Sequence, residues 1–456
     1  MSKKIPERSE IAVENTWRLE DLYGSDELWQ ADLVKFQQQI DALTGFAGKI
    51  SQSAADLLAY MKLRDEISIL ADRLGNYAMR RGDQDTRNSH YQGMVGQFTT
   101  AYVEADEKTS FETPELLSIP EEKMAEFYRE QPELALYRRH FDRIFRKRDH
   151  ILSLEQEKLL AGAGEMSHSP SDIFSMFSNA DLKFKPALDK DGNEHPLSQG
   201  SFVSCLESAD RVLRKNAFEA YYESYQGFRN TCAATLKANV KQLQFFANAR
   251  NYASPLEASL DQTEVPTSVY HQLIEAVHQN LDKMHRYVRL RKKMLGVDAL
   301  HFYDVYAPLV GDLKKSYSYE TAQEMVLKAV APLGEDYQAT VRKAYAERWI
   351  DVYPNRGKRG GAYSGGCYDS NPYILLNFSG TLDSVSTLAH EMGHTIHSWR
   401  SRRHQPPQYA DYTLFVAEVA STVNENLLIE QLLANENDPQ TRLYPVSYTH
   451  LRAHET

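Results

Sequence analysis

The stretch TLAHEMGHTIHSW, residues 387–399, carries the pattern H-E-x-x-H at His390, Glu391 and His394. The turns before it are apolar, as a buried helix requires: Leu382, Val385 and Leu388. On a helix, histidines four residues apart project from one face, and two neutral imidazoles so placed can hold one Zn²⁺. Glu391 lies about 100° around the helix from His390, where it can take a proton from an attacking water instead of binding the metal. The alternative is a helix whose two histidines are satisfied by hydrogen bonds alone.

A third ligand is predicted in the segment LFVAEVASTVNENLL, residues 414–428, which also has a helical pattern. Glu418 follows His394 by 24 residues and has apolar neighbours: Phe415, Val416, Val419 and Ala420. We expect this carboxylate to be paired or metal-bound, because an unpaired buried charge is strongly unfavourable. Three protein ligands and one open position make a catalytic zinc site. We therefore predict one Zn²⁺ per chain, bound by His390, His394 and Glu418.

A second glutamate, Glu425, lies one heptad after Glu418, on a similar face of the same predicted helix. It is a candidate to orient a metal-binding histidine through that histidine's other ring nitrogen. The alternative, which the sequence leaves open, is that Glu425 is exposed on the surface.

Two stretches before the histidines are also candidates for the site. The first is YPNRGKRGGAYSGGCYDS, residues 353–370, which has five glycines but lacks the G-K-[ST] order of a P-loop. It is a hairpin tip, a flexible loop close to a bound peptide, or both, so Gly361 and Tyr363 are candidates near the substrate. The second is NPYILLNFSG, residues 371–380, an apolar strand. It is either a core strand or an edge to which a peptide adds as another strand.

The remaining pattern is mainly helical. Ser25 and Asp26 are candidate N-caps of a helix through Trp29, and short β structure is expected near residues 182–203 and 355–380. The basic run YRRHFDRIFRKRDH, which begins at Tyr137, has aromatic residues at helical spacing. The arginines therefore read as the solvated face of a helix and not as a nucleic-acid site.

Composition narrows the class of protein. The chain has 456 residues and a formal net charge of −11, which argues against a nucleic-acid partner. Its three cysteines are scattered, without a CxxC pair, so a reducing compartment fits better than a disulfide framework. The first 17 residues have no apolar signal segment, and the chain has no apolar run long enough to cross a membrane. We expect a cytoplasmic protein without a membrane partner.

The chain resembles the thimet-oligopeptidase family of zinc peptidases, in particular its bacterial oligoendopeptidase F branch. The resemblance covers nearly the whole chain and rests on these stretches: ERSEIAVENTWRLEDLY (7–23), ARNYASPLEASL (249–260), LHFYDVYAPL (300–309), GKRGGAYSGGCYDSNPYILLNF (357–378), LAHEMGHTIHSW (388–399) and FVAEVASTVNE (415–425). The last two, at their observed separation, are the most specific.

The resemblance implies a mainly α fold: a large helical body with a deep substrate channel, zinc at its floor and a small β element beside the zinc helix. It implies cleavage of internal bonds in short peptides, so oligopeptides are the expected partners. His390, His394 and Glu418 match the family's zinc ligands, and Glu391 matches its general base and acid. His397 matches a further family histidine whose role stays open.

Four regions are expected. Residues 1–110 form an N-terminal helical region, and 111–200 an oligopeptidase F N-terminal-type region of helix and strand. Residues 201–445 form the zinc-peptidase catalytic domain, incomplete at its C-terminal end. Residues 446–456, VSYTHLRAHET, resemble the translated sequence of a transposase-based sequencing-library adapter and are expected to be a non-native tail.

This interpretation excludes a second metal site at the end of the chain, although His450, His454 and Glu455 show a similar spacing. Relative to the family the chain stops early, and the segment with the family's carbonyl-stabilising histidine and tyrosines is not found. We therefore expect weak or no turnover from these 456 residues. The rival functions are a catalytically impaired peptide-binding fragment and a zinc aminopeptidase, although the GAMEN-type loop common in such aminopeptidases is missing.

Overall fold

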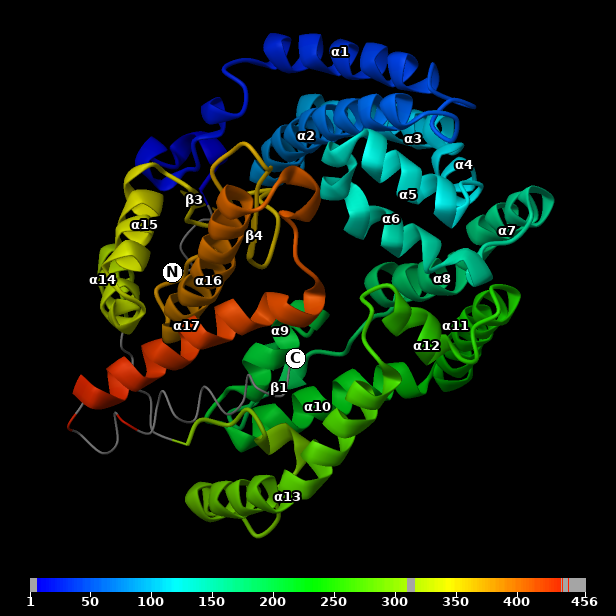
Figure 1. Ribbon diagram of the computed structural model, residues 1–456. Helices are drawn as coiled ribbons and strands as arrows, with labels where there is room; N and C mark the ends of the chain where they lie inside the picture. Colours follow the sequence, from blue (N-terminus) through cyan, green and yellow to red (C-terminus); the bar gives the residue numbers. More distant parts are fainter. Residues whose placement is uncertain (1–5, 310–315, 436, 438–441, 443–456) are drawn as a thin grey trace. The chain divides into compact units, whose positions relative to one another are not determined.

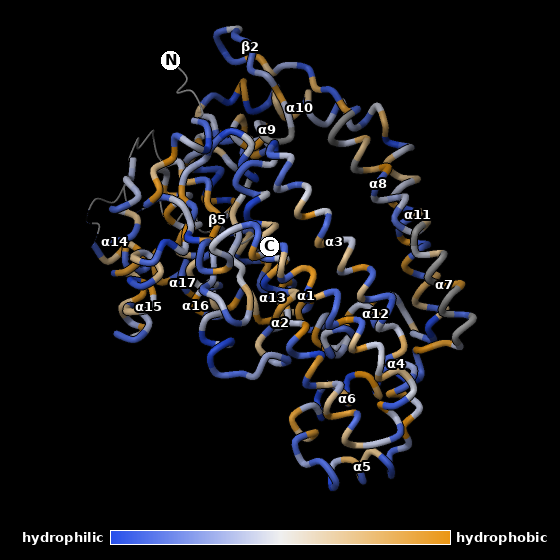
Figure 2. Tube along the Cα trace, turned by 90° about the horizontal axis from the view of Figure 1, so that it is seen from above, coloured by the Kyte–Doolittle hydropathy of each residue, from blue (hydrophilic) through white to orange (hydrophobic). Residues whose placement is uncertain are grey.

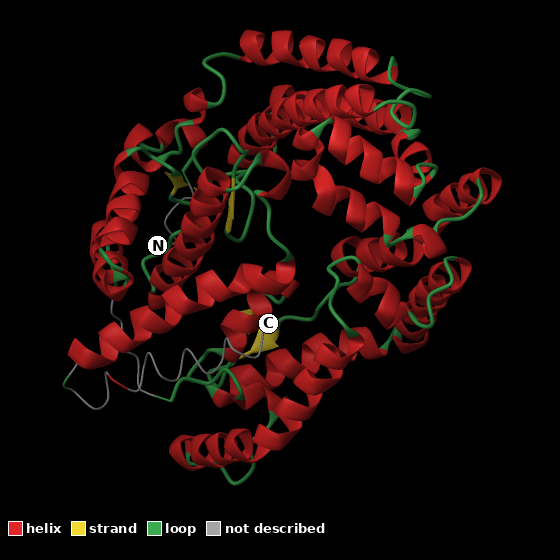
Figure 3. Ribbon diagram, viewed as in Figure 1, coloured by secondary structure: helices red, strands yellow, loops and turns green. Residues whose placement is uncertain are grey.

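A computed structural model describes residues 6–309, 316–435, 437 and 442. The protein is mainly helical with a few short strands (Figure 3), which confirms the predicted fold class. Within the described ranges, no helix combines the length and apolar character that crossing a membrane requires. The tail predicted from residue 446, with its two histidines, lies outside the described residues.

The chain divides into two compact units, and each is described by itself. The first unit contains residues 1–148 and 315–434, and the second contains 149–314 and 435–456. The division at residues 110, 200 and 445 stays a prediction.

The first unit is helical with one small sheet. Its elements are α1 (Asp26–Thr44), α2 (Ala54–Gln84), α3 (Ser89–Thr109), α4 (Glu112–Leu117), α5 (Glu121–Glu130), α6 (Arg138–Phe145), α14 (Tyr319–Ala329), α15 (Glu335–Ala346), β3 (Ile350–Asp351), β4 (Tyr363–Gly365), β5 (Tyr373–Leu375), α16 (Leu382–His404) and α17 (Leu414–Asn435).

Helices α1, α2 and α3 pack side by side (Figure 1) around the main core of this unit. Helix α1 begins at Asp26, and the Ser25 side chain accepts a hydrogen bond from the Leu28 amide, so Ser25 is the N-cap and Asp26 is not. Along α5 and α6, hydrophobic and hydrophilic residues alternate (Figure 2). Tyr137 and Phe141 are buried, which confirms that the basic run is amphipathic.

The sheet has the strand order β3–β5–β4, with β3 parallel and β4 antiparallel to β5. Because β5 is the middle strand and its three residues are fully buried, both of its edges are occupied. The prediction that segment 371–380 offers a free edge to a peptide is therefore wrong, and the core-strand alternative holds. An edge strand of this sheet is β4, from the glycine-rich stretch. It lies on α16, where the Ser364 and Thr395 hydroxyls are 2.8 Å apart.

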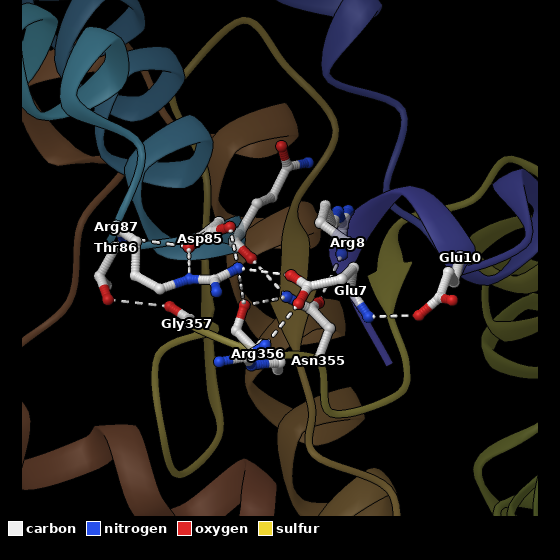
Figure 4. Close-up of polar contacts among 10 residues, drawn as sticks. Glu7, Arg8, Glu10, Asp85, Thr86, Arg87, Asn355, Arg356 and Gly357 are labelled. Atoms are coloured by element: carbon white, nitrogen blue, oxygen red, sulfur yellow. Dashed lines mark hydrogen bonds and ion pairs between the residues drawn. The ribbon is translucent and has the colours of Figure 1, made fainter. Parts of the chain in front are cut away.

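The N-terminal segment, residues 6–18, runs beside residues 348–356 and hydrogen-bonds to their backbone. The Val352 amide donates to the Asn15 carbonyl at 3.0 Å, and the Arg356 amide donates to the Pro6 carbonyl at 2.8 Å. The Glu7 carboxylate accepts from both Arg87 and Arg356 at 2.8 Å (Figure 4). The start of the chain therefore fixes the segment that leads into the glycine-rich loop.

The first glycine of that loop is also fixed. Gly357 has a φ of 78°, and a Cβ there would collide with the side chains of Asp85 and Arg87. Its carbonyl accepts hydrogen bonds from the Thr86 amide and hydroxyl at 2.7 and 2.9 Å (Figure 4). This end of the loop is a constrained turn. In contrast, a Cβ added to Gly361 would meet no atom within 4 Å.

The second unit is helical with one hairpin. Its elements are α7 (Leu154–Ser167), α8 (Ser169–Met176), β1 (Ala187–Leu188), β2 (Glu194–His195), α9 (Gln199–Leu206), α10 (Arg211–Gln226), α11 (Arg229–Ala249), α12 (Pro255–Asp261) and α13 (Thr267–Leu295). Strands β1 and β2 form an antiparallel hairpin within residues 182–203, where short β structure was predicted, and Gly192 in its turn has a φ of 83°.

A buried charge network holds part of the second unit together. Asp304 is fully buried and accepts hydrogen bonds from Arg211 at 2.9 Å and from Arg214 at 3.0 Å. Arg291, also buried, donates to the Asp304 carbonyl. Burial alone would raise the pKa of Asp304, but the hydrogen bonds from the arginines outweigh it and lower the pKa to about 2.

We expect Asp304→Asn to lower the free energy of unfolding by about 3–5 kcal/mol, because it leaves Arg214 without its buried counter-charge. Since the folded pKa is depressed, the contribution is fully present above the unfolded pKa of about 3.9 and is lost as the pH falls towards 2. Urea unfolding at pH 7 and at pH 3 checks this. Asp282→Asn, at an exposed position of α13, is the control, and equal effects of both variants would contradict the role of the network.

Candidate metal centre

Helices α16 and α17 carry the candidate metal ligands. Helix α16 begins after Thr381, whose side chain accepts a hydrogen bond from the Ser384 amide at 3.2 Å. One turn apart on this helix, His390 and His394 direct their Nε2 atoms to within 3.1 Å of each other. The predicted helical pair is therefore correct, and both rings are partly buried.

Glu418 on α17 completes a cluster of three ligand atoms. Its Oε2 lies 3.4 Å from His390 Nε2 and 3.5 Å from His394 Nε2. Ligands held tetrahedrally at Zn–N and Zn–O distances of about 2.0–2.1 Å lie about 3.3 Å from one another. The three observed separations, 3.1, 3.4 and 3.5 Å, fit one shared cation of this size.

Glu425 lies behind the cluster, as one of the two alternatives predicted. Its Oε1 is 2.5 Å from His390 Nδ1, and only 16% of its side chain is exposed. This contact holds the Nδ1 proton and leaves the Nε2 lone pair facing His394 and Glu418. Burial favours a neutral ring, but the hydrogen bond and the charge of Glu425 outweigh it and raise the pKa of His390.

The second histidine has the opposite electrostatic environment. Burial and the nearby charge of His390 lower the pKa of His394. A metal ion binds both imidazoles in their neutral form, so a lowered pKa of His394 favours the binding form of this ring.

Glu391 follows His390 on α16 but is not one of the three clustered ligands. Its residue is 7% exposed, and its charge contributes to raising the pKa of His390, so the carboxylate lies near the cluster. A buried carboxylate beside a metal site is suited to proton transfer.

The environment of Glu418 differs from the prediction. Its side chain is 47% exposed, and its apolar neighbours Phe415 and Val419 are exposed as well. The argument that a buried charge demands a metal is therefore wrong for this residue. What places Glu418 is instead its helix, together with a hydrogen bond of 2.9 Å from the Ser421 hydroxyl to its Oε2.

Sequence reasoning missed the residue that lets the two helices meet. A Cβ on Gly393 would lie 2.6 Å from the Ala420 carbonyl oxygen and 2.6 Å from Ser421 Cα, both backbone atoms of α17. Only glycine permits this approach, which brings Glu418 to the histidines. The signal was present, because a glycine inside a helix is unfavourable unless a close contact requires it.

We expect Gly393→Ala to push α17 away, weakening zinc binding and lowering the free energy of unfolding by about 1–3 kcal/mol. Gly96→Ala is the control. That glycine is also inside a helix, α3, with nothing within 4 Å of the added Cβ, so alanine should raise stability by about 0.5–1 kcal/mol. Urea unfolding of the metal-free proteins and a zinc competition titration measure both. If both variants changed the free energy of unfolding in the same direction, the close approach of α17 to Gly393 would be contradicted.

The other predicted site residues lie outside the three-ligand cluster. The Tyr363 hydroxyl donates to Asp83 at 2.7 Å, and the Gly361 carbonyl accepts from the Asn377 side chain at 2.8 Å. The His397 ring stacks on Tyr412 with a centroid separation of 3.7 Å, and burial lowers its pKa. Their nearness to a substrate stays a prediction.

Two family models match this chain, and the match of the first includes the helices α16 and α17. A family model described as peptidase family M3 matches residues 204–448, more than half of the chain. The chain belongs to peptidase family M3. A second model, described as oligopeptidase F, matches residues 115–184 of this M3 peptidase. The family predicted from the motifs is confirmed.

Two relatives and two solved structures extend the match over nearly the whole M3 peptidase. Oligopeptidase PepF of Bacillus subtilis is 43% identical over 98% of this chain and 67% of the relative. Group B oligopeptidase PepB of Streptococcus agalactiae is 40% identical over 95% and 72%. A structure described as a peptidase of Chlamydophila abortus has a TM-score of 0.88 at 34% identity, covering 99% of this chain and 76% of that one. Oligoendopeptidase-F of Enterococcus faecium has a TM-score of 0.67 at 33% identity, covering 94% and 72%.

Proposed function

We propose that this M3 peptidase is a zinc-dependent oligoendopeptidase that hydrolyses internal bonds of short peptides. The observation that carries the proposal is the cluster of His390 Nε2, His394 Nε2 and Glu418 Oε2, with separations that match one tetrahedral ion. The oligopeptidase names of its relatives support short peptides as the substrate class.

In this proposal the three clustered side chains hold one Zn²⁺, and Glu425 orients His390 from behind. Bound zinc would polarise the scissile carbonyl and lower the pKa of the attacking water to about 7. The chain's own contribution is to fix the three ligand atoms and, through the Glu425 contact at His390 Nδ1, to direct the Nε2 lone pair of that ring towards the metal.

Glu391 is proposed as the general base and then the general acid. Its carboxylate accepts a proton from water as the water oxygen bonds to the scissile carbonyl carbon. It then returns the proton to the amide nitrogen as the C–N bond breaks, so that the leaving group departs as a neutral amine. Its burial supports this role, because a carboxylate shielded from bulk water exchanges its proton with the bound water and the leaving group and not with solvent.

Strand β4 is proposed as the place where the substrate backbone binds. In the described part of the chain β4 pairs only with β5, and it runs along the metal-site helix α16. A peptide can add to such an edge through main-chain hydrogen bonds, which tolerate many side chains.

The free cysteines Cys205, Cys232 and Cys367 support a reducing, cytoplasmic location.

Digestion of a nonapeptide tests the proposal, with products identified by mass spectrometry and zinc measured in the same sample. Internal fragments, however slowly they form, are expected to disappear with a chelator and to return with zinc. Release of single residues from the N-terminus would instead identify an aminopeptidase. Peptide binding without cleavage by the zinc-loaded chain would favour the peptide-binding alternative.

A further inference from the structure

A second residue on α17 is buried against the metal-site helix without being a ligand. Asn424 is 1% exposed and immediately precedes Glu425. Its Nδ2 donates to the carbonyl of Ala389 at 3.1 Å, the residue just before His390. This side-chain amide therefore ties α17 directly to the turn of α16 that carries the first histidine.

The hydrogen bond is not one that α16 needs for its own stability. A carbonyl inside an α-helix already accepts from the amide four residues later, and its second lone pair remains free for another donor. The bond from Asn424 therefore adds a contact between helices, and its direction fixes where α17 lies along α16.

A third helix fixes the orientation of the amide. The Tyr337 hydroxyl of α15 donates to Asn424 Oδ1 at 3.0 Å, and α15 lies beside α16 in Figure 1. Burial raises the pKa of Tyr337 to about 12, so this hydroxyl stays a neutral donor. Because Oδ1 is occupied by a donor, Nδ2 must face the Ala389 carbonyl, and only one amide orientation satisfies both contacts.

Two contacts one turn apart then determine the position of α17. At Ala420 and Ser421 its backbone touches Gly393, and one turn later Asn424 reaches Ala389. The first contact sets the distance between the helices, and the second sets their register. The two functional glutamates, Glu418 and Glu425, lie on either side of this pair of contacts.

Resting on the proposed zinc site, we propose that Asn424, held by the Tyr337 hydroxyl, is a positioning residue that sets the register of α17 so that Glu418 and Glu425 reach the histidines. Ligand distances in a working metal site hold to within about 0.2 Å. A site whose supporting contacts allow a slip of about 1 Å fails even when every ligand is present.

The test compares the chain with Asn424→Ala, Tyr337→Phe and the control Asn426→Ala. Asn426 is on the same helix, but it is exposed, and its side chain donates to the Thr422 carbonyl of that same helix. Zinc affinity is measured by competition with a chromophoric chelator, and the visible spectrum of the cobalt-substituted proteins reports ligand geometry. Urea unfolding of the metal-free proteins measures stability separately.

We expect Asn424→Ala to weaken zinc binding about 10–100-fold, as the loss of other groups behind metal ligands does, and to change the cobalt spectrum. Tyr337→Phe should change both in the same direction, by less. Asn426→Ala should stay within about twofold of the parent in zinc affinity, as is usual for exposed positions, and should keep the parent spectrum.

Asn424→Ala could keep the zinc affinity and cobalt spectrum of the parent and only lower the urea midpoint. That result would show that Asn424 contributes to stability and does not position the ligands. If circular dichroism shows that this variant does not fold, Tyr337→Phe decides, and a parent-like affinity and spectrum there overturn the proposal. A parent chain that binds no zinc would instead refute the proposed ligand set, and the positioning role would fall with it.

Discussion

Glu391→Gln is expected to bind zinc like the parent chain and to lower kcat/KM for a short peptide by about 10²–10⁴-fold, the usual contribution of a general acid–base group. Glutamine has nearly the same volume as glutamate, so the buried position on α16 stays filled. What is lost is the ability to accept a proton from water and to return it to the leaving amine. This variant should therefore lose turnover while keeping its zinc affinity.

The measurement is cleavage of an internally quenched nonapeptide at saturating zinc, with the zinc content of each protein determined in parallel. Glu324→Gln is the matched control, because Glu324 is an exposed glutamate of α14 that forms a 3.5 Å surface ion pair with Lys328. Such a surface pair contributes little, so this variant should cleave like the parent. A zinc-loaded Glu391→Gln protein that keeps about a tenth or more of the parent rate would contradict the proton-transfer role.

The histidine motif allowed the most secure prediction, because helical geometry alone sets the relative position of two side chains four residues apart on one helix. The same local rule predicted the mainly helical pattern and the helix through Trp29, and short β structure was predicted near residues 182–203, where the β1–β2 hairpin lies. In each case the signal lies within a few turns of chain. Tertiary contacts were not needed to find these elements.

The environment of Glu418 could not be predicted in the same way. Its apolar neighbours suggested burial, yet Phe415 and Val419 are exposed. Periodicity shows which residues share a helix face, but it does not show what covers that face. The residue was chosen correctly as a member of the cluster, but for a physical reason that the structure does not support.

The sheet shows a second limit of local reasoning. Strand β3 has only two residues, Ile350 and Asp351, too few for a periodic pattern, and it was not predicted. Its pairing with β5 makes β5 the central strand. The role of segment 371–380 therefore depended on a partner that the local pattern could not reveal.

Glu418→Ala is expected to weaken zinc binding by at least about 100-fold, because it removes a ligand and thus exceeds the 10–100-fold effect of losing a group behind a ligand. The two imidazoles that remain cannot alone supply three protein ligands. In contrast, the metal-free protein should change little in stability, within about 0.5 kcal/mol, because the Glu418 side chain is 47% exposed.

Urea unfolding with and without zinc separates these two effects. A ligand that binds only the folded state adds about 2.7 kcal/mol at 100 times its Kd. The parent should therefore gain roughly that stability at a zinc concentration where the variant gains less than about 0.5 kcal/mol. Glu430→Ala on the same helix is the matched control, since Glu430 is exposed and lies outside the cluster. If Glu418→Ala gained as much stability from zinc as the parent does, Glu418 would not be a ligand, and the metal would have to be held by a different third group beside His390 and His394.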